Sequence, residues 1–368
     1  MSVTTQEQAP QPLGFGDAAP WFTAPALGGA PAYSFGTAAG RPSLLLFFGS
    51  AGHPDSRAAL DAVLARRDLF NDVDACFFGV TVDPADERDG RIAQQLPGIR
   101  YFLDYDRAVS RRYGAAQEEG RYLPHALVLD AAQRVVARYG IGQAAAALDR
   151  LEELAGGGVE GDWAPVLLAP RILEPELCRE LIAYYERHGG EESGFMRDVG
   201  GKTMLLTDPA HKKRRDREVS DPELRGALGA RIRRRLLPMV MRAFQFEATR
   251  MERYLIGCYD AERGGHFRPH RDNTTKGTAH RRFAVSINLN AGDFDGGDLR
   301  FPEFGPRTYR PPTGGAVVFS CSLLHEATPV TRGTRYAFLP FLYDEAAAKV
   351  REENNAHLGD NVTAYRAG

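Results

Sequence analysis

The chain has 368 residues, 43% hydrophobic and 26% charged, an ordinary globular composition whose length favours two domains. A net charge of -2 gives no basic field to attract nucleic acid, and no apolar run is long enough to span a bilayer. We therefore expect neither nucleic acid nor a membrane as a partner. The four cysteines form no CxxC pair and the first residues lack a secretory pattern, which indicates a cytoplasmic protein without a disulfide framework.

The first part of the chain, residues 1–155, alternates short apolar runs with amphipathic stretches. The expected strands are 43–49, 75–83, 99–106 and a hairpin of 125–130 with 134–142, and the expected helices are 55–70, 87–96 and 143–155. Strands that alternate with helices predict an α/β domain with a covered sheet. Residues 156–164 are rich in glycine and have no period, so they predict a linker.

The next part, residues 165–345, has a different pattern. Two helices are expected at 175–189 and 220–244, the second bent at Pro238, with a long loop at 190–219 between them. Short strands separated by Gly, Pro and Asp turns then follow up to Tyr343. This order predicts a sandwich or double-stranded β-helix (jelly roll) with flanking helices. The last residues, 346–368, are predicted to be a C-terminal tail.

A candidate metal site comes from two parts of this second domain. His270 and Asp272 stand two residues apart, so on a strand both side chains point to one face, and His325 follows a later strand. Two imidazoles and one carboxylate form the facial triad that leaves open positions on Fe(II) for O2 and a chelating cosubstrate. The alternative is a rim ion pair of His270 with Asp272 and an unrelated histidine at the end of a strand.

Arg335 strengthens the metal hypothesis. It lies ten residues after His325 in an otherwise apolar run, where an unpaired charge is costly. An arginine at this place can take the distal carboxylate of an iron-bound 2-oxoglutarate by a two-pronged contact. The sequence therefore predicts a cosubstrate anchor next to the metal.

Residues 165–343 resemble the prolyl-4-hydroxylase-like branch of the Fe(II)/2-oxoglutarate oxygenases. The matching segments are CYDAERGGHFRPHRDN, FAVSINLN, GGDLRFP, GGAVVF and HEATPVTRGTRYAF. The resemblance implies that His270, Asp272 and His325 bind iron and that Arg335 binds 2-oxoglutarate. It also puts Tyr259 and Asn288 at positions where relatives carry cosubstrate-binding tyrosines, although Tyr259 fits core packing equally well.

The chemistry that this resemblance implies is hydroxylation of a C–H bond in a small-molecule or peptidyl substrate. The cosubstrates are 2-oxoglutarate and O2, the co-products are succinate and CO2, and ascorbate is a candidate reductant. The alternatives are a catalytically silent binding or regulatory protein, a metal-dependent oxygenase that uses no 2-oxoglutarate, and a thiol peroxidase. The basic run 211–218 is a candidate lid for an acidic substrate, with a solvated loop as the alternative.

Residues 14–150 resemble the peroxiredoxin and thioredoxin-like superfamily, from GDAAPWFTAPAL to the closing helix. The resemblance implies a cis bond at Leu123–Pro124. The loop 47–57, which carries the reactive cysteine in that superfamily, contains none, and Cys76 falls inside an apolar strand. We therefore expect a redox-inactive module that acts as a scaffold, presents substrate or forms a homodimer.

Overall fold

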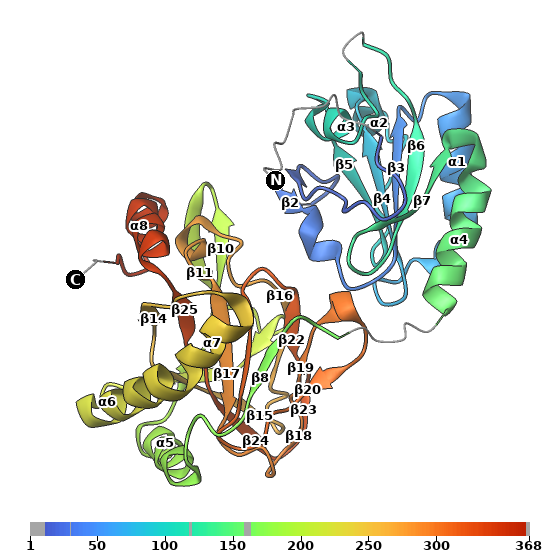
Figure 1. Cartoon of the computed structure of the whole chain (residues 1–368). Coiled ribbons are helices and arrows are strands. Elements are labelled where there is room, and N and C mark those ends of the chain that lie inside the picture. Colours follow the sequence, from blue (N-terminus) through green and yellow to red (C-terminus); the bar gives the residue numbers. More distant parts are fainter. Residues whose placement is uncertain (1–11, 30, 118–119, 158–162, 366–368) are drawn as a thin grey trace, which may run out of the picture. The chain divides into compact units, whose positions relative to one another are not determined.

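The computed structural model describes residues 12–29, 31–117, 120–157 and 163–365. The chain divides into two compact units (Figure 1), one of Met1–Asp162 with Pro302–Gly305 and one of Trp163–Phe301 with Pro306–Gly368. Most of the predicted linker 156–164 lies outside the described residues. The two units are taken in turn.

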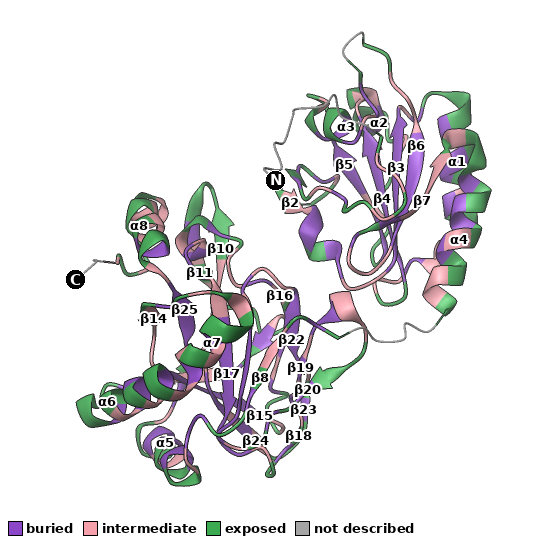
Figure 2. Cartoon of the chain, viewed as in Figure 1, coloured by how far each residue is buried: buried purple, intermediate pink, exposed green. Residues whose placement is uncertain are grey.

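The N-terminal unit is built on a five-stranded mixed sheet with the order β5-β4-β3-β6-β7. Its strands are β3 Ser43–Gly49, β4 Cys76–Thr81, β5 Ile99–Leu103, β6 His125–Leu129 and β7 Val135–Gly140, and a small hairpin joins β1 Thr23–Ala24 to β2 Tyr33–Ser34. β3, β4 and β5 run parallel, whereas β6 and β7 are antiparallel. Every residue of β3, β4 and β6 is buried (Figure 2), as expected for a sheet covered on both faces.

Helices and aromatic side chains cover this sheet. One face packs against α1 Pro54–Ala65 and α4 Ala144–Gly156, through small and branched apolar residues of both helices. The other face carries a second cluster rich in phenylalanine, and the short helices α2 Pro84–Arg88 and α3 Ala108–Arg112 complete the unit. The predicted α/β thioredoxin-like domain is confirmed.

Two local predictions in this unit are wrong. The expected helix 87–96 ends at Arg88, because Gly90 adopts a left-handed conformation (φ 64°) that stops the helix. Of the described residues, only Leu96–Pro97 has a cis peptide bond, so Leu123–Pro124 is trans. The Leu123 N–H donates to the carbonyl of Ala115 (2.7 Å), and this bond holds the chain as it enters β6.

The C-terminal unit consists mainly of two antiparallel sheets. The larger has the order β14-β25-β17-β24-β15-β13-β9, with β21 beside β17 and β8 beside β21. Its strands are β8 Leu167–Ala169, β9 Glu191–Glu192, β13 Arg215–Glu218, β14 Arg250–Glu252, β15 Leu255–Asp260, β17 Phe283–Asn288, β21 Ala316–Ser320, β24 Thr334–Phe338 and β25 Phe341–Tyr343. The smaller sheet has the order β12-β16-β22-β19-β20. Its strands are β12 Lys212–Lys213, β16 His266–His270, β19 Leu299–Arg300, β20 Thr308–Tyr309 and β22 His325–Ala327. This arrangement agrees with the predicted jelly roll.

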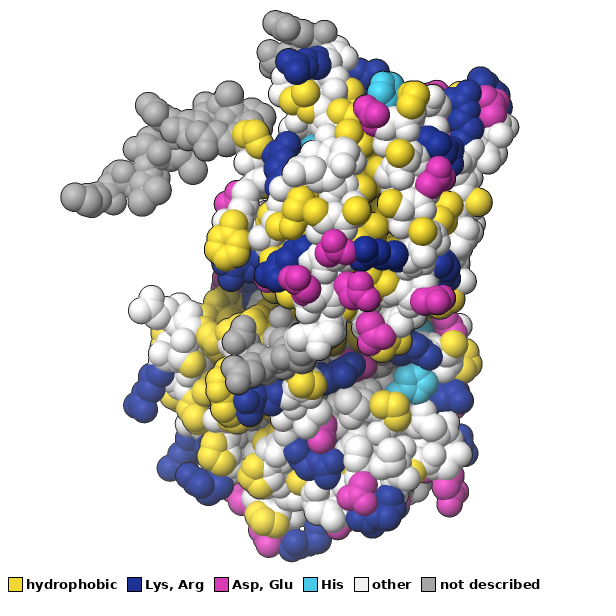
Figure 3. Space-filling view, turned by 90° about the vertical axis from the view of Figure 1, so that its right-hand side faces the viewer, with side chains coloured by type: hydrophobic (Ala, Val, Ile, Leu, Met, Phe, Trp, Pro, Cys, Tyr) yellow, Lys and Arg dark blue, Asp and Glu magenta, His cyan; other side chains and the backbone are white. Residues whose placement is uncertain are grey.

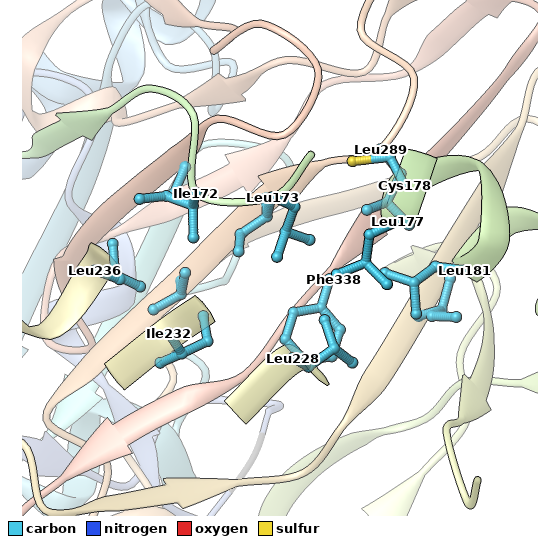
Figure 4. Close-up of a cluster of buried hydrophobic side chains, with 14 of the residues drawn as sticks. Ile172, Leu173, Leu177, Cys178, Leu181, Leu228, Ile232, Leu236, Leu289 and Phe338 are labelled. Atoms are coloured by element: carbon cyan, nitrogen blue, oxygen red, sulfur yellow. The ribbon is translucent and has the colours of Figure 1, made fainter. Parts of the chain in front are cut away.

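Helices pack outside the larger sheet, as predicted. They are α5 Pro175–His188, α6 Pro222–Arg231, α7 Leu237–Phe244 and, after the last strand, α8 Glu345–Glu353. In Figure 4, Leu181 of α5 and Leu228 of α6 point toward Phe338 of β24, and all three are fully buried. A π-helical turn separates α6 from α7 immediately before Pro238, where the lost N–H and the bulk of the ring disturb regular helix.

The predicted loop 190–219 is wrong, because the segment forms short strands. β9 and β13 belong to the larger sheet and β12 to the smaller. β10 Phe195–Val199 pairs with β11 Lys202–Leu206 in a separate hairpin. The sequence hid β9, β12 and β13 because every residue in them is charged, so hydrophobicity does not alternate. The glycines on either side of β10, and between it and β11, favoured a loop there. The predicted tail is also partly ordered, since α8 covers its first residues.

The surface carries both signs of charge. Lys and Arg side chains alternate with Asp and Glu over the face shown in Figure 3, which fits the small net charge. Among the described residues, none of the helices combines the length and the apolar character that crossing a bilayer requires.

Candidate metal centre

Two neighbouring strands of the smaller sheet bring the predicted metal ligands together. β16 ends at His270 and β22 begins at His325, and these two residues are partners in the antiparallel pairing. Asp272 lies two residues after His270, and its backbone N–H donates to the carbonyl of Cys321 (2.9 Å), which fixes the turn. His270 and His325, 55 positions apart in the sequence, therefore converge with Asp272 on one point because of strand pairing.

The three side chains form a compact set of donor atoms. The Nε2 atom of His270 lies 3.6 Å from Oδ1 of Asp272, and Nε2 of His325 lies 3.3 Å from Oδ2. One ligand atom from each side chain lies within 4.8 Å of the others. Two imidazole nitrogens and one carboxylate at this spacing fit the facial set of a non-haem ferrous site.

Backbone carbonyls orient both imidazoles. Nδ1 of His270 lies 2.8 Å from the carbonyl oxygen of Arg268, and Nδ1 of His325 lies 3.0 Å from that of Leu323. A carbonyl only accepts, so each Nδ1 carries the proton in a neutral ring. The lone pair is then on Nε2, which is the atom that faces Asp272. This second layer of contacts prepares the rings for a metal ion.

Burial and charge favour the protonation states that a cation needs. Burial, together with the nearby His325, lowers the pKa of His270 to about 4, so this imidazole is neutral at pH 7. Burial by itself raises the pKa of Asp272, but the electrostatic interaction with His325 and the contact with His270 outweigh it and hold the pKa well below its usual range. Aromatic rings enclose the histidines: Phe267 stacks on His270 (3.4 Å between centroids) and Phe319 meets His325 edge-on (4.5 Å).

Arg335, the predicted cosubstrate anchor, lies on β24 with 3% of its surface exposed. Its Nη2 atom donates to Oγ of Ser286 (2.9 Å) and its Nε atom donates to Oδ1 of Asn288 (3.3 Å). Among the described residues no carboxylate pairs with it. Burial lowers the pKa of this guanidinium, which marks the cost of leaving the charge without a partner. A carboxylate from a ligand would remove that cost.

The other two predicted cosubstrate residues both touch the arginines of this site. The ring of Tyr259 lies 5.2 Å from the Cζ atom of Arg335, and its hydroxyl accepts from Nη1 of Arg214 (3.3 Å). The amide of Asn288 donates to the carbonyl of Pro311 (2.9 Å) while its oxygen holds Arg335. Direct contact of Tyr259 and Asn288 with a cosubstrate stays a prediction. In this structure Asn288 positions the anchor.

Three charged residues of the basic run escaped the sequence analysis. Lys212, Arg214 and Asp216 alternate along β12 and β13, and the first two are buried. Arg214 forms a two-pronged pair with Asp216, through Nε (2.6 Å) and Nη2 (2.7 Å). Their period of two was visible in the sequence, but nothing there distinguished a charged inner face from a solvated one.

The outer face of the same strands carries a different feature. A surface cleft of about 410 Å³ is lined by Lys213 and Arg215 together with Cys258 and Tyr336. Cys258 and Tyr336 alternate along β15 and β24 with Tyr259 and Arg335, so this cleft opens on the face opposite the cosubstrate anchor. It is therefore separate from the metal centre.

Comparison with known families agrees with the site geometry. Residues 254–343, which contain all six predicted site residues, match the family model described as the 2OG-Fe(II) oxygenase superfamily. The C-terminal unit carries a 2OG-Fe(II) oxygenase domain. Residues 15–138 match the AhpC/TSA family, so the N-terminal unit carries a domain of that family.

Curated relatives match parts of the oxygenase domain. A PKHD-type hydroxylase of Pseudomonas fluorescens is 40% identical over 112 residues, which cover 28% of this chain and 47% of that protein. Procollagen-lysine,2-oxoglutarate 5-dioxygenase 2 of Homo sapiens is 29% identical over 180 residues, or 46% of this chain. This chain spans only 22% of the length of the human protein.

Solved structures resemble each unit separately. A prolyl-4-hydroxylase of Pseudomonas putida covers 53% of this chain and 96% of its own, with 20% identity and a TM-score of 0.38. AhpC of Mycobacterium tuberculosis covers 40% of this chain and 96% of its own, with 17% identity and a TM-score of 0.34.

The AhpC/TSA domain has no cysteine in the loop where the resemblance puts the reactive one. Its one cysteine, Cys76, is buried in β4, and burial raises the pKa of the thiol. A protonated and enclosed thiol is a poor nucleophile. The loop after β3, where the resemblance puts the reactive cysteine, holds His53 immediately before α1, without a cysteine.

Proposed function

We propose that this protein is an Fe(II)- and 2-oxoglutarate-dependent dioxygenase that hydroxylates a C–H bond of a small-molecule or peptidyl substrate. The reaction consumes 2-oxoglutarate, O2 and R–H and yields succinate, CO2 and R–OH. One observation carries the proposal: the triad of His270, Asp272 and His325, of which His325 is buried and the other two are half-buried, shares its domain with Arg335. Arg335 is a buried cation that lacks a carboxylate partner among the described residues. Names of relatives that specify hydroxylases and a 2-oxoglutarate dioxygenase support the same reaction class.

The residues of the triad would hold the metal. A ferrous ion bound by them supplies the redox chemistry that couples decarboxylation of 2-oxoglutarate by O2 to oxidation of the substrate. The carbonyls of Arg268 and Leu323 keep the Nε2 atoms of both histidines directed at the ion. The surrounding rings of Phe267 and Phe319 limit the access of water to this region.

Arg335 would bind the distal carboxylate of the cosubstrate. Ser286 and Asn288 hold its guanidinium in one orientation, so the entropy cost of ordering this side chain is met before the ligand arrives. A planar guanidinium makes two parallel hydrogen bonds to a carboxylate, which gives both affinity and direction. The other end of 2-oxoglutarate is thereby directed toward the triad.

The decisive experiment measures succinate formation and cosubstrate affinity in the purified full chain with Fe(II). We expect 2-oxoglutarate-dependent succinate release, and we expect Arg335→Met to raise the Kd of 2-oxoglutarate by about 100-fold, since a charge-assisted contact is lost. The control Arg332→Met removes an exposed arginine of the preceding strand, which pairs with Asp295, and should change nothing. Unaltered affinity in Arg335→Met would favour an oxygenase that needs no 2-oxoglutarate. Binding without turnover would favour a silent regulatory protein.

The proposal extends to the compartment and to the N-terminal unit. All four cysteines are free and buried, which supports a reducing compartment such as the cytoplasm. Ascorbate is the candidate reductant. We propose that the AhpC/TSA domain has a scaffolding or dimerising role, and sedimentation of the full chain against residues 163–368 tests whether it forms a homodimer.

A further inference from the structure

The basic segment that precedes β15 presents two different faces. The polar ends of Lys212, Arg214 and Asp216 contact the interior of the oxygenase domain. Lys213 and Arg215 line the outer cleft, which Arg214 also borders. Side chains alternate across a strand, so this division follows from the extended backbone of β12 and β13. The inner row places charge where a jelly roll normally has apolar residues.

The inner row contains more positive than negative charge. Arg214 uses both oxygens of Asp216 in its two-pronged pair. Lys212 donates instead to neutral groups, Oγ of Ser193 (2.6 Å) and the carbonyl of Gly194 (2.6 Å). No carboxylate of the described residues forms an ion pair with this ammonium, although only 6% of the residue is exposed.

Asp216 and Asp272 act on this ammonium only from beyond ion-pair distance, and a buried ammonium with no carboxylate in direct contact is unfavourable. An ammonium has three N–H donors, and hydrogen-bond acceptors among the described residues occupy only two of those on Lys212. Burial, with the neighbouring Arg214, lowers the pKa of Lys212 well below its usual range. A carboxylate brought by a ligand would supply the third acceptor and a charge in direct contact.

This ammonium lies beside the metal centre. Nζ of Lys212 is 4.7 Å from the ring centroid of Phe267, and that ring is stacked 3.4 Å from the ring of His270. The ammonium is therefore no further from the His270 ring than these two distances combined. His211, the preceding residue, has its ring 6.4 Å from the ring of His270.

The carboxylates of 2-oxoglutarate already have positions under the proposed function, one at Arg335 and one at the metal. We propose that the substrate of this dioxygenase carries a carboxylate group, which Lys212 binds while a nearby C–H bond faces the metal. This inference rests on the proposed function, and it narrows the substrate class to carboxylates. Arg214 and Ser193 keep Lys212 in position through their shared hydrogen bonds.

Matched fragments test this assignment. The full chain is loaded with Zn(II), a redox-silent stand-in for Fe(II), and with 2-oxoglutarate. Ligand-observed NMR then measures the Kd values of acetate, propionate and benzoate against those of acetamide, propionamide and benzamide. We expect the acids to bind at least about 10-fold more tightly than the amides, as a hydrogen bond to a charged group implies. Lys212→Gln should abolish the preference, whereas Lys212→Arg, which keeps the charge, should retain it.

The matched control is Lys213→Gln, because this neighbour lies on the outer face and should leave the preference unchanged. The inference is overturned if wild-type protein shows no preference for acids, if no acid binds, or if the preference survives Lys212→Gln. It is also overturned if Lys212→Gln weakens 2-oxoglutarate as much as the acids, since Lys212 would then belong to the cosubstrate site. Titration of 2-oxoglutarate in the same samples reports separately on the proposed function, which fails only if wild-type protein does not bind it.

Discussion

At the scale of single residues, His325 is the ligand that the chain brings from furthest away. Its Nε2 atom faces Asp272, and its Nδ1–H donates to the carbonyl of Leu323. Nε2 is therefore the ring atom that can bind a metal ion. We expect His325→Ala to reduce Fe(II) affinity by more than the roughly 10- to 100-fold that loss of an outer-shell partner costs.

Anaerobic equilibrium dialysis against Fe(II) measures this change. The control is His266→Ala on the same strand as His270, because within the described part of the chain the ring of His266 bonds only to the backbone carbonyls of Gly264 and Ala210. Equal iron affinity in both variants would contradict the assignment of the triad.

His125 in the N-terminal unit makes stability depend on pH. Burial of His125 at the start of β6 lowers the pKa of its imidazole to about 4, against 6.5 for a free imidazole. Because the unfolded chain takes up a proton below pH 6.5 that the folded chain resists, stability is complete above this pH and falls between pH 6.5 and 4. The difference between these two pKa values corresponds to a loss of about 3 kcal/mol at the lower end.

Denaturant unfolding of the N-terminal unit between pH 7.5 and 4.5 measures this loss. In His125→Phe, whose ring can still stack on Phe47, the fall should be much smaller. In His53→Phe, where the histidine is exposed, the fall should persist. An identical pH dependence in wild type and His125→Phe would refute the explanation.

At the scale of elements, α5 is attached to the larger sheet by its apolar side. Leu181 is fully buried in the cluster that also contains Leu228 and Phe338 (Figure 4), whereas Glu180 beside it is exposed. We expect Leu181→Ala to lower the free energy of unfolding of the oxygenase domain by about 2 to 5 kcal/mol, from lost burial and the cavity left behind. Glu180→Ala should change it by less than about 0.5 kcal/mol. Urea titrations of residues 163–368 compare the two.

The elements also show what a sequence can predict. The core strands of the N-terminal unit were predictable as short continuous apolar runs, and the helix α5 because apolar residues recur with a period of 3.6. The start of α6 was predictable from Asp221 and Pro222. The ligands and Arg335 were predictable because their chemistry is unusual in an apolar context. The strands β12 and β13 were not predictable, since every residue in them is charged and only tertiary pairing with β16 and β15 distinguishes them from a solvated loop.

The roles of Asn288, Lys212 and Arg214 depend on tertiary structure, so the sequence alone did not predict them. Asn288 was expected next to the cosubstrate, but its role as a support for Arg335 depends on the register of β17 against β24. Lys212 and Arg214 looked like part of a solvated basic run. Their burial follows from strand pairing, which local sequence does not specify.

At the scale of the whole molecule, the two units have separate hydrophobic clusters, so each can fold around its own core. We expect residues 163–368 alone to bind Fe(II) and 2-oxoglutarate with affinities within about 3-fold of the full chain, because all predicted site residues lie in that unit. Calorimetry on the full chain and on the truncated chain measures both affinities. A large loss on truncation would assign the AhpC/TSA domain a direct part in the site.

The alternation of Lys212, Lys213, Arg214 and Arg215 has a consequence for how this protein can change over time. These positions are chemically similar, so substitutions that exchange lysine for arginine would look conservative at all four. A deletion or insertion of one codon within this stretch would be different, because it would turn the exposed pair inward and expel the enclosed pair, with almost no change in composition. Related sequences that accept Lys-to-Arg exchanges in this stretch but no insertion or deletion would be those whose function still requires the inward-facing lysine.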